Sequence, residues 1–396
     1  MAKLDEEIYL VSPKRTPIGR FGGTLLPLTA ADLGVAAAKG ALESADLDPQ
    51  LVDEVIFGNA RQAGVGPNVA RQVAIRSGAR HETPAYTVNQ ACGSGMRAIM
   101  NAADQIRLGN ARMVLAGGTE SMSNTPYLLT NARWGLRMGD SEVVDGMTRD
   151  GFLCPLADEM MGATAETLAD RYGISRDEQD DYAVRSQQKA GKAWDEGAFE
   201  AEIVPVEVKT RKESIMLDRD EHPRPDTSVE KMKKLPPVFR DHGTVHAGNA
   251  SGVTDGASAM IVAGVEAVRE HRLEPIARIV GYSQAGVDPK VMGIGPVPAT
   301  KTILRENGIS LDDIGLIELN EAFAAQVIAC DRELHLDPER LNVHGGAIAL
   351  GHPIGATGAR ITTTLVHAMK RRDERLGLAT LCISGGMGLA LLLERC

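Results

Sequence analysis

The segments VDEVIFGNA (residues 52–60) and IGLIELNEA (residues 314–322) decide the fold, because they are two versions of one pattern in a single chain. A shift of about 262 residues superimposes them and, to within one residue, places Asn59 opposite Asn320. Self-similarity at a fixed spacing indicates a repeated architecture. The chain is therefore predicted to contain two similar halves.

Each half alternates strands with helices. Each begins with a strand-like segment, IYLVSP (residues 8–13) or ARIVGYS (residues 277–283). A helix, a second strand, a helix opened by glycines and a further strand follow. This alternation predicts an α/β protein in which each half contains a mixed, largely buried sheet covered by helices.

The two halves differ by an insertion in the first. In the second half, residues 378–394 (LATLCISGGMGLALLLE) are typical of two adjacent strands joined by a glycine turn. The equivalent first-half strands, RMVLAGG and SAMIVAG, are separated by about 130 residues. We therefore expect a first half of residues 1–121 with 252–273, an inserted domain of residues 122–251, and a second half of residues 274–396. The charged insertion is either a lid or cofactor clamp, or a solvated surface without a ligand.

Composition indicates a globular protein in a reducing compartment. Of 396 residues, 43% are hydrophobic, and the formal net charge of −10 disfavours a nucleic-acid-binding surface. The cysteines at positions 92, 154, 330, 382 and 396 are odd in number and form no C-x-x-C pair. This pattern disfavours both a disulfide framework and a zinc site, so no metal is expected.

The ends of the sequence favour a cytoplasmic location. The opening residues, MAKLDEE, contain no hydrophobic signal region, and no apolar run reaches the roughly 18 residues of a membrane span. The final residues, ERC, match no peroxisomal tripeptide. We expect a cytoplasmic enzyme without a membrane span.

Cys92 is the first candidate for chemistry. It lies in AYTVNQACGSGM (residues 85–96), where a β-rich segment stops at glycines and a helix begins. The positive end of the helix dipole favours the thiolate there, which is the form that attacks carbonyl groups. The alternative is a small buried residue in a packed turn.

His352 lies in a loop with five glycines, GGAIALGHPIGATG (residues 345–358). The repeat lays residues 95–97 on residues 358–360, so this loop takes the place of the Cys92 turn in the other half. Two packed halves would bring both helix starts to one cleft. There His352 would deprotonate Cys92 or bind an oxyanion, and a structural histidine is the alternative.

Cys382 and Asn320 complete the candidates. Cys382 ends the strand LATLC beside a glycine turn, where a thiol is either a core residue or an acid or base that approaches a ligand closely. Asn320 follows a strand and opens a helix in ELNEAFAA. Its side chain either caps that helix or holds a water or a carbonyl oxygen in an oxyanion hole.

Together these segments resemble the thiolases, the family of acetyl-CoA acetyltransferases and 3-ketoacyl-CoA thiolases, over essentially the full length. The segments that carry the resemblance are RTPIGRFGG, VNQACGSGM, AGGTESMS, HAGNASGVTDGASA, GVDPKVMGIGPVPA, NEAFAAQ, NVHGGAIALGHPIGATGAR and GLATLCISGGMG. The resemblance implies duplicated halves that form a five-layered α-β-α-β-α core with an inserted, CoA-binding loop domain. It also implies acyl-CoA and CoA as substrates, no permanently bound cofactor, and a homodimer or homotetramer.

The resemblance assigns a role to each candidate. Cys92 is implied as the nucleophile that accepts the acyl group, and His352 as the residue that activates it and serves an oxyanion hole. Cys382 is implied as the acid or base at C2 of the acetyl-CoA unit, and Asn320 as the holder of a water in that hole. A second hole uses backbone N–H groups of the nucleophile and of a glycine two residues after the second cysteine. This chain has Ser384 there, which questions any need for a glycine conformation.

The family's CoA-contacting positions also transfer to this sequence. They correspond to Met161, Arg224, Phe239, Ala247, Ser251, Met292, Ala322 and Phe323. Short-chain biosynthetic members carry a histidine before the pantetheine-contacting methionine, whereas this chain has Met160, as many degradative members do. The segment around Met292 is similar to the short-chain type, so the indications on chain length are mixed.

Two other functions compete with an active thiolase. One is a catalytically inactive, thiolase-like lipid carrier. The retention of all four candidate residues argues against it: Cys92, Asn320, His352 and Cys382. The other is a dinucleotide-dependent oxidoreductase, suggested only by the α/β pattern and the glycine content. No G-x-G-x-x-G motif follows the first strand to support it.

Overall fold

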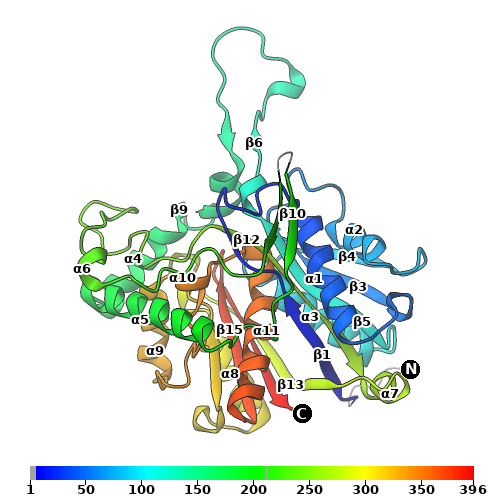
Figure 1. Cartoon of the computed structure of the whole chain (residues 1–396). Helices are drawn as coiled ribbons and strands as arrows, with labels where there is room; N and C mark the ends of the chain where they lie inside the picture. Colours follow the sequence, from blue (N-terminus) through cyan, green and yellow to red (C-terminus); the bar gives the residue numbers. More distant parts are fainter. Residues whose placement is uncertain (1–5, 211–212) are drawn as a thin grey trace.

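The computed structural model describes residues 6–210 and 213–396 (Figure 1). The elements before the insertion, together with the two that follow it, are β1 (Ile8–Arg15), β2 (Gly19–Arg20), α1 (Ala30–Ser44), β3 (Glu54–Gly58), α2 (Val69–Arg76), β4 (Ala85–Val88), α3 (Ser94–Arg107), β5 (Met113–Ser121), β12 (Thr254–Gly264) and α7 (Val265–Glu270). The second half contains β13 (Pro275–Gly286), α8 (Pro296–Asn307), β14 (Leu316–Leu319), α9 (Ala324–Leu334), α10 (Ala347–Leu350), α11 (Ile354–Arg372), β15 (Leu376–Ile383) and β16 (Met387–Arg395).

The segment between β5 and β12 has its own short elements. They are β6 (Tyr127–Leu128), β7 (Val144–Asp145), β8 (Leu153–Cys154), β9 (Glu159–Met160), α4 (Met161–Tyr172), α5 (Arg176–Asp195), β10 (Val206–Lys209), β11 (Ser214–Leu217) and α6 (Val229–Met232). β5 and β12 themselves pair antiparallel, with Asp255 opposite Ser121 and Ala263 opposite Met113. The long segment therefore leaves and re-enters the sheet between two neighbouring strands.

Strands of both halves form one ten-stranded sheet in the order β14-β15-β16-β13-β1-β12-β5-β3-β4, with β2 paired to β12. The β14–β15, β3–β4 and β3–β5 pairs are parallel and the others antiparallel, so the sheet is mixed, as predicted. The sequence predicts a sheet in each half. The structure joins the two, because β1 pairs with β13 and Ile8 lies opposite Ile279. This pairing satisfies the backbone groups that two edge strands would otherwise leave open.

Helices form the outer and central layers of the predicted five-layered core. α1 and α2 pack on strands of the first half, and α8 packs on β13 and β16 of the second. α3 packs on first-half strands, whereas α11 contacts strands of both halves as well as α3. Figure 1 shows α11 between strands coloured blue and strands coloured yellow to red. The α3–α11 pair is therefore the middle layer.

Two glycines allow α3 and α11 to touch. A Cβ atom at Gly358 would lie 2.3 Å from the backbone nitrogen of Met96, and one at Gly95 would lie 2.8 Å from that of Ala359. Both distances are too short for a side chain, so only glycine permits this close approach. The contact sets the starts of the two helices side by side.

The repeat register predicted from the sequence is confirmed in three dimensions. Asn59 and Asn320 each follow directly on an equivalent strand, β3 or β14. Cys92 and His352 each lie two residues before an equivalent helix, α3 or α11. Within the described parts of the chain, no helix combines the length and the apolar character needed to cross a bilayer.

Candidate active site

Cys92 lies in a tight turn between β4 and α3 that its neighbours hold in place. The Oγ atom of Ser94 accepts from the backbone nitrogen of Gln90 at 2.9 Å and donates to the carbonyl of Ala91 at 2.7 Å. Ala91 itself has φ +44°, in the left-handed region that residues with a side chain rarely adopt. The turn thus presents a partly exposed thiol at the start of a helix.

The Cys92 thiol is neutral at rest. Burial raises its pKa, and three effects oppose this rise: a hydrogen bond from the Ser384 N–H, the charge of Arg61 and the residue's own N–H. Because burial dominates, the pKa of the thiol lies above its ordinary value although the helix start favours the thiolate. The N–H groups of Cys92 and Ser384, which act to lower the pKa of the thiol, are those the resemblance assigns to the second oxyanion hole. Ser384 is not among the described residues with positive φ, so this position has no need of glycine.

His352 is held as a neutral base. Its backbone N–H donates to the Gly252 carbonyl at 3.1 Å, and the preceding Gly351 has φ +105°. The Thr357 hydroxyl donates to the Pro353 carbonyl at 3.0 Å, so ring Nδ1 must be the donor in its 2.6 Å contact with that hydroxyl. Nε2 therefore keeps its lone pair. It is buried and has no partner among the residues that the structure describes.

Burial also shifts the pKa of His352. Desolvation, followed by the charges of Arg360 and Arg61, lowers its pKa to about 3. An imidazole with so low a pKa is uncharged at physiological pH and can accept a proton. A neutral thiol and a neutral imidazole thus stand at the starts of two adjacent helices.

Asn320 does not cap the following helix. The N-cap of α9 is Phe323, so the capping alternative is wrong. The Asn320 backbone N–H donates to the Thr380 carbonyl at 3.0 Å, while both side-chain amide atoms are buried without a partner in the described part of the chain. A buried amide without partners is costly unless a water or a substrate oxygen bonds to it.

Cys382 belongs to an apolar cluster that contains most of the predicted pantetheine contacts. It lies near the end of β15, and burial raises its pKa well above the ordinary value, with Cys92 adding to the rise. The cluster includes four of the predicted residues, with Phe239 packed against it: Met161, Met292, Ala322 and Phe323. The Phe239 and Phe323 rings meet edge to face at 6.1 Å. The structure thus brings Cys382 together with residues far apart in the sequence.

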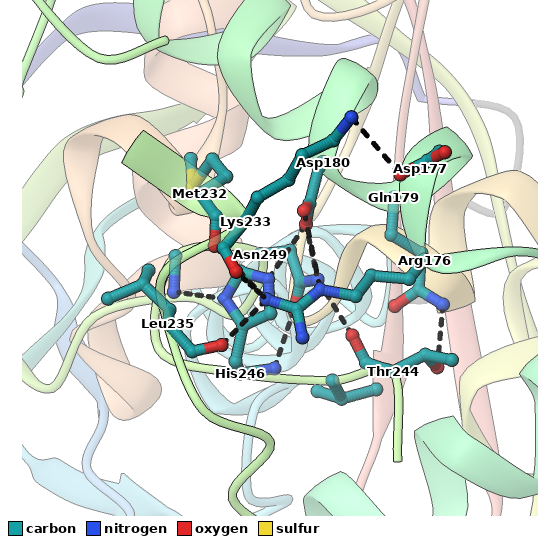
Figure 2. A network of polar contacts seen from close by, with 12 residues as sticks. Arg176, Asp177, Gln179, Asp180, Met232, Lys233, Leu235, Thr244, His246 and Asn249 are labelled. Atoms are coloured by element: carbon teal, nitrogen blue, oxygen red, sulfur yellow. Dashed lines mark hydrogen bonds and ion pairs between the residues drawn. The ribbon is translucent and has the colours of Figure 1, made fainter. Parts of the chain in front are cut away.

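A buried polar network shapes the loop of residues 244–251, which carries two further predicted contacts (Figure 2). Asp180 of α5 accepts from His246 Nε2 at 2.7 Å and from Asn249 Nδ2 at 3.0 Å. The Gly248 N–H donates to His246 Nδ1 at 3.1 Å, which fixes Nε2 as the protonated ring nitrogen.

The same loop is tied to the start of α9. The Ala324 N–H donates to the Asn249 carbonyl at 2.9 Å, and the Ser251 N–H donates to the Ala322 carbonyl at 3.0 Å. Ser251 therefore lies beside the apolar cluster. Ala247 and Arg224 are exposed at the surface, outside that cluster, and the Arg224 backbone N–H donates to Gln187.

Two charged residues near Cys92, Glu120 and Arg61, were not predicted from the sequence. Glu120 is buried and accepts from the backbone N–H groups of Ala60, Arg61 and Gly355 and from Asn59 Nδ2. It thus ties the loop after β3 to the start of α11. Arg61 is buried two residues after Asn59. The repeat register contained a signal for Arg61. Arg61 is equivalent to Ala322, a predicted CoA contact, because each lies two residues after the asparagine that follows its strand.

Fold and site together define a thiolase. The thiolase N-terminal domain model matches residues 8–266, and the thiolase C-terminal domain model matches residues 273–395. These matches cover nearly the whole chain, which therefore belongs to the thiolase family.

Two curated relatives and two solved structures illustrate the similarity. The chain is 51% identical to acetyl-CoA acetyltransferase of Escherichia coli, over 98% of each chain. It is 47% identical to mitochondrial 3-ketoacyl-CoA thiolase of Homo sapiens, again over 98% of each. The structure of the Bacillus anthracis acetyl-CoA acetyltransferase has a TM-score of 0.97 at 45% identity and full coverage of both chains. That of the human mitochondrial 3-ketoacyl-CoA thiolase in complex with CoA has a TM-score of 0.96 at 46% identity, covering 100% of this chain and 99% of the other.

Proposed function

We propose that this thiolase cleaves 3-ketoacyl-CoA with CoA, and in reverse condenses two acetyl-CoA, through an acyl group carried on Cys92. One observation carries the proposal: Cys92 and His352 lie at the starts of two helices in contact, α3 and α11, and the His352 Nε2 is buried without a partner in the described part of the chain. A nucleophile, a base and oxyanion donors at one place are what acyl transfer requires.

In thiolysis, the first half-reaction breaks a carbon–carbon bond. His352 Nε2 takes the thiol proton while the Cys92 sulfur attacks the 3-keto carbon, and the N–H groups of Cys92 and Ser384 bind the oxyanion. The C2–C3 bond then breaks, which leaves the acyl group on Cys92 and acetyl-CoA as an enolate. The Cys382 thiol gives its proton to C2, and the proton held by His352 restores that thiol.

The enolate oxygen needs its own stabilisation. Protonated His352 supplies one donor, and a water held by Asn320 supplies the other. In the second half-reaction, His352 removes the thiol proton of the incoming CoA, whose sulfur attacks the acyl carbon. The Cys92 thiolate leaves and recovers that proton. Condensation is the same sequence in reverse, with ping-pong kinetics.

In this proposal, CoA lies between residues of the inserted segment and residues of the second half. Met161, Phe239, Met292, Ala322 and Phe323 contact pantetheine beside Cys382, while Ala247 and Ser251 contact it from the 244–251 loop. Arg224 serves the nucleotide end. The shared apolar cluster of Cys382 with Met161, Met292, Ala322 and Phe323 supports this placement. Residues 122–251 thus act as the CoA-binding domain inserted between the two halves.

Cytoplasmic location and a homodimer or homotetramer complete the proposal. Curated relatives carry both acetyl-CoA acetyltransferase and 3-ketoacyl-CoA thiolase names, so short and longer acyl chains are both candidates. A rate profile against 3-ketoacyl-CoA substrates of increasing length separates them. A flat profile favours a degradative enzyme, and a cutoff after four or five carbons favours an acetoacetyl-CoA enzyme.

Cys92→Ala tests the nucleophile. Because the acyl group then has no carrier, we expect a loss of thiolysis of more than about 10³-fold. In the wild-type enzyme incubated with acetoacetyl-CoA alone, peptide mass analysis should find one acetyl group on Cys92. The Cys382→Ser variant should still be acetylated at Cys92 when acetyl-CoA is the donor. It should lose the exchange of the C2 protons of acetyl-CoA with solvent. Full thiolysis by Cys92→Ala would refute the mechanism.

A further inference from the structure

Arg61 occupies a slot that its surroundings fit closely. Its side chain is only 6% exposed, and its guanidinium lies 5.6 Å from the centre of the Phe152 ring. Nη1 donates to the Asp150 carbonyl at 3.3 Å. A Cβ atom at Gly151 would lie 2.2 Å from Nη2, so the guanidinium fills the space that a side chain there would need. The group is therefore held in one place.

Two nitrogens of the Arg61 guanidinium lack a hydrogen-bond acceptor in the described part of the chain. Nε and Nη2 are buried without a hydrogen-bond partner among residues 6–210 and 213–396. Buried guanidinium N–H groups without an acceptor are costly, and natural proteins rarely leave them so. No described residue around the slot therefore supplies an acceptor for the Nε and Nη2 hydrogens of Arg61.

The neighbouring carboxylates do not supply that acceptor. In the described ranges, no carboxylate lies within 4.0 Å of the Arg61 nitrogens. The Asp150 carboxylate pairs with exposed Arg149. Glu120 offsets part of the Arg61 charge, since Arg61 opposes the rise that burial causes in the Glu120 pKa. Its oxygens, however, bond to Asn59 and to three backbone N–H groups.

The slot lies on the acyl side of the site. Phe152 packs with Cys92 in an apolar cluster of Ala60, Met122, Met147 and Ile354, whereas Cys382 packs in the separate cluster proposed for pantetheine. The loop that carries Arg61 touches the nucleophile turn directly, because Asn89 Nδ2 donates to the Ala60 carbonyl at 3.2 Å. Cys92, Phe152 and Arg61 therefore lie close together, apart from the cluster proposed for pantetheine.

We propose that Arg61 binds the far end of the acyl group and that the enzyme takes 3-oxoacyl-CoA thioesters whose acyl chain ends in a carboxylate. Nε and Nη2 lie on one edge of the guanidinium, and this pair of donors matches the two oxygens of a carboxylate. The carboxylate would complete the hydrogen bonds of a guanidinium that forms no ion pair within residues 6–210 and 213–396. This inference rests on the proposed function, since it assumes that Cys92 carries the acyl group.

The test compares two probes of equal length, 3-oxoadipyl-CoA, which ends in a carboxylate, and 3-oxohexanoyl-CoA, which ends in a methyl group. The wild-type enzyme should thiolyse the carboxylate-ended probe with the higher kcat/KM. Arg61→Leu should lower the ratio of the two kcat/KM values at least about tenfold. Arg61→Lys keeps the charge but loses the paired donors, and should give an intermediate ratio.

Arg149→Leu is the matched control, since Arg149 belongs to the same segment but is exposed, and it should leave the ratio unchanged. A wild-type preference for the methyl-ended probe, or an equal ratio in wild type and Arg61→Leu, overturns the inference. Should Arg61→Leu fail to fold, the wild-type preference and the Arg61→Lys ratio still decide. Acetoacetyl-CoA is assayed in parallel. Its cleavage by the wild type without a carboxylate preference refutes only the role of Arg61, whereas no cleavage of any probe refutes the proposed function.

Discussion

Burial keeps both Cys92, the proposed nucleophile, and His352, its proposed base, uncharged before substrate binds. It raises the pKa of the Cys92 thiol and, with Arg360 and Arg61, lowers the pKa of His352 to about 3. Desolvation disfavours the charged form of each group, which raises the pKa of an acid and lowers that of a base. A resting thiolate–imidazolium pair would require the opposite order of the two pKa values. The proton must therefore move when the thiol attacks.

The rate of Cys92 alkylation by iodoacetamide should reveal this order. Only the thiolate reacts, so the rate should rise steadily with pH and still be rising at about pH 8.5, the ordinary thiol pKa. Peptide mass analysis of a Cys396→Ser protein follows Cys92 without interference from that exposed thiol. A rate that is flat between about pH 6 and 8 would mean a preformed thiolate, contrary to the expectation.

At the scale of elements, α5 positions the loop that carries Ala247 and Ser251. The connection is the buried pair of Asp180 and His246, extended by Asn249, and both partners of the pair are fully buried. Arg176 lies 3.6 Å from the same carboxylate (Figure 2). Because one carboxylate holds two side chains of the loop, its removal leaves both without their acceptor.

Asp180→Ala should therefore weaken CoA binding more than chemistry. We expect KM for CoA to rise about five- to twentyfold with kcat within about threefold, and the free energy of unfolding to fall by about 3 kcal/mol. Steady-state kinetics and urea denaturation measure these effects. Asp181→Ala, an exposed neighbour on α5, is the control and should change neither. A fall in kcat at unchanged KM would contradict the positioning role.

At the scale of the whole molecule, one segment projects from the core. Figure 1 shows the connection between β6 and β7 extending away from the rest of the chain. It exposes large apolar side chains, with Trp134 85% and Met138 98% exposed. Apolar side chains gathered on a projecting segment are typical of an interaction surface, and we expect a second copy of the chain to cover it.

Trp134→Ser combined with Met138→Ser should reduce the size of the oligomer. The substitutions remove apolar area that association would bury, so the smaller species should dominate at equal protein concentration. Light scattering coupled to size exclusion measures the mass. Arg133→Ser, an exposed neighbour in the same segment, should leave the mass unchanged. An unaltered mass in the double variant would assign the interface to another surface.

The repeat in the sequence predicted much of this architecture. Strand and helix order, the mixed sheet and the equivalence of the Cys92 and His352 loops follow from periodicity and glycine positions, which depend on local backbone preferences. The joining of β1 to β13 did not follow, because pairing between distant edge strands leaves no local signal. The burial of Arg61 could not be predicted either, since it depends on contacts with Phe152 and Gly151, about 90 residues away in the sequence.

The sequence by itself predicted which residues carry the proposed chemistry and which family the chain belongs to, because nucleophile, base and glycine turns are local patterns. The tertiary structure decided their state. It removed Cys92 partly and His352 almost fully from water, which sets their protonation, and it assigned the cap of α9 to Phe323, which left the Asn320 amide without a partner among the described residues. Charge state and hydrogen-bond satisfaction depend on everything that surrounds a group, and those surroundings come from segments far apart in the chain.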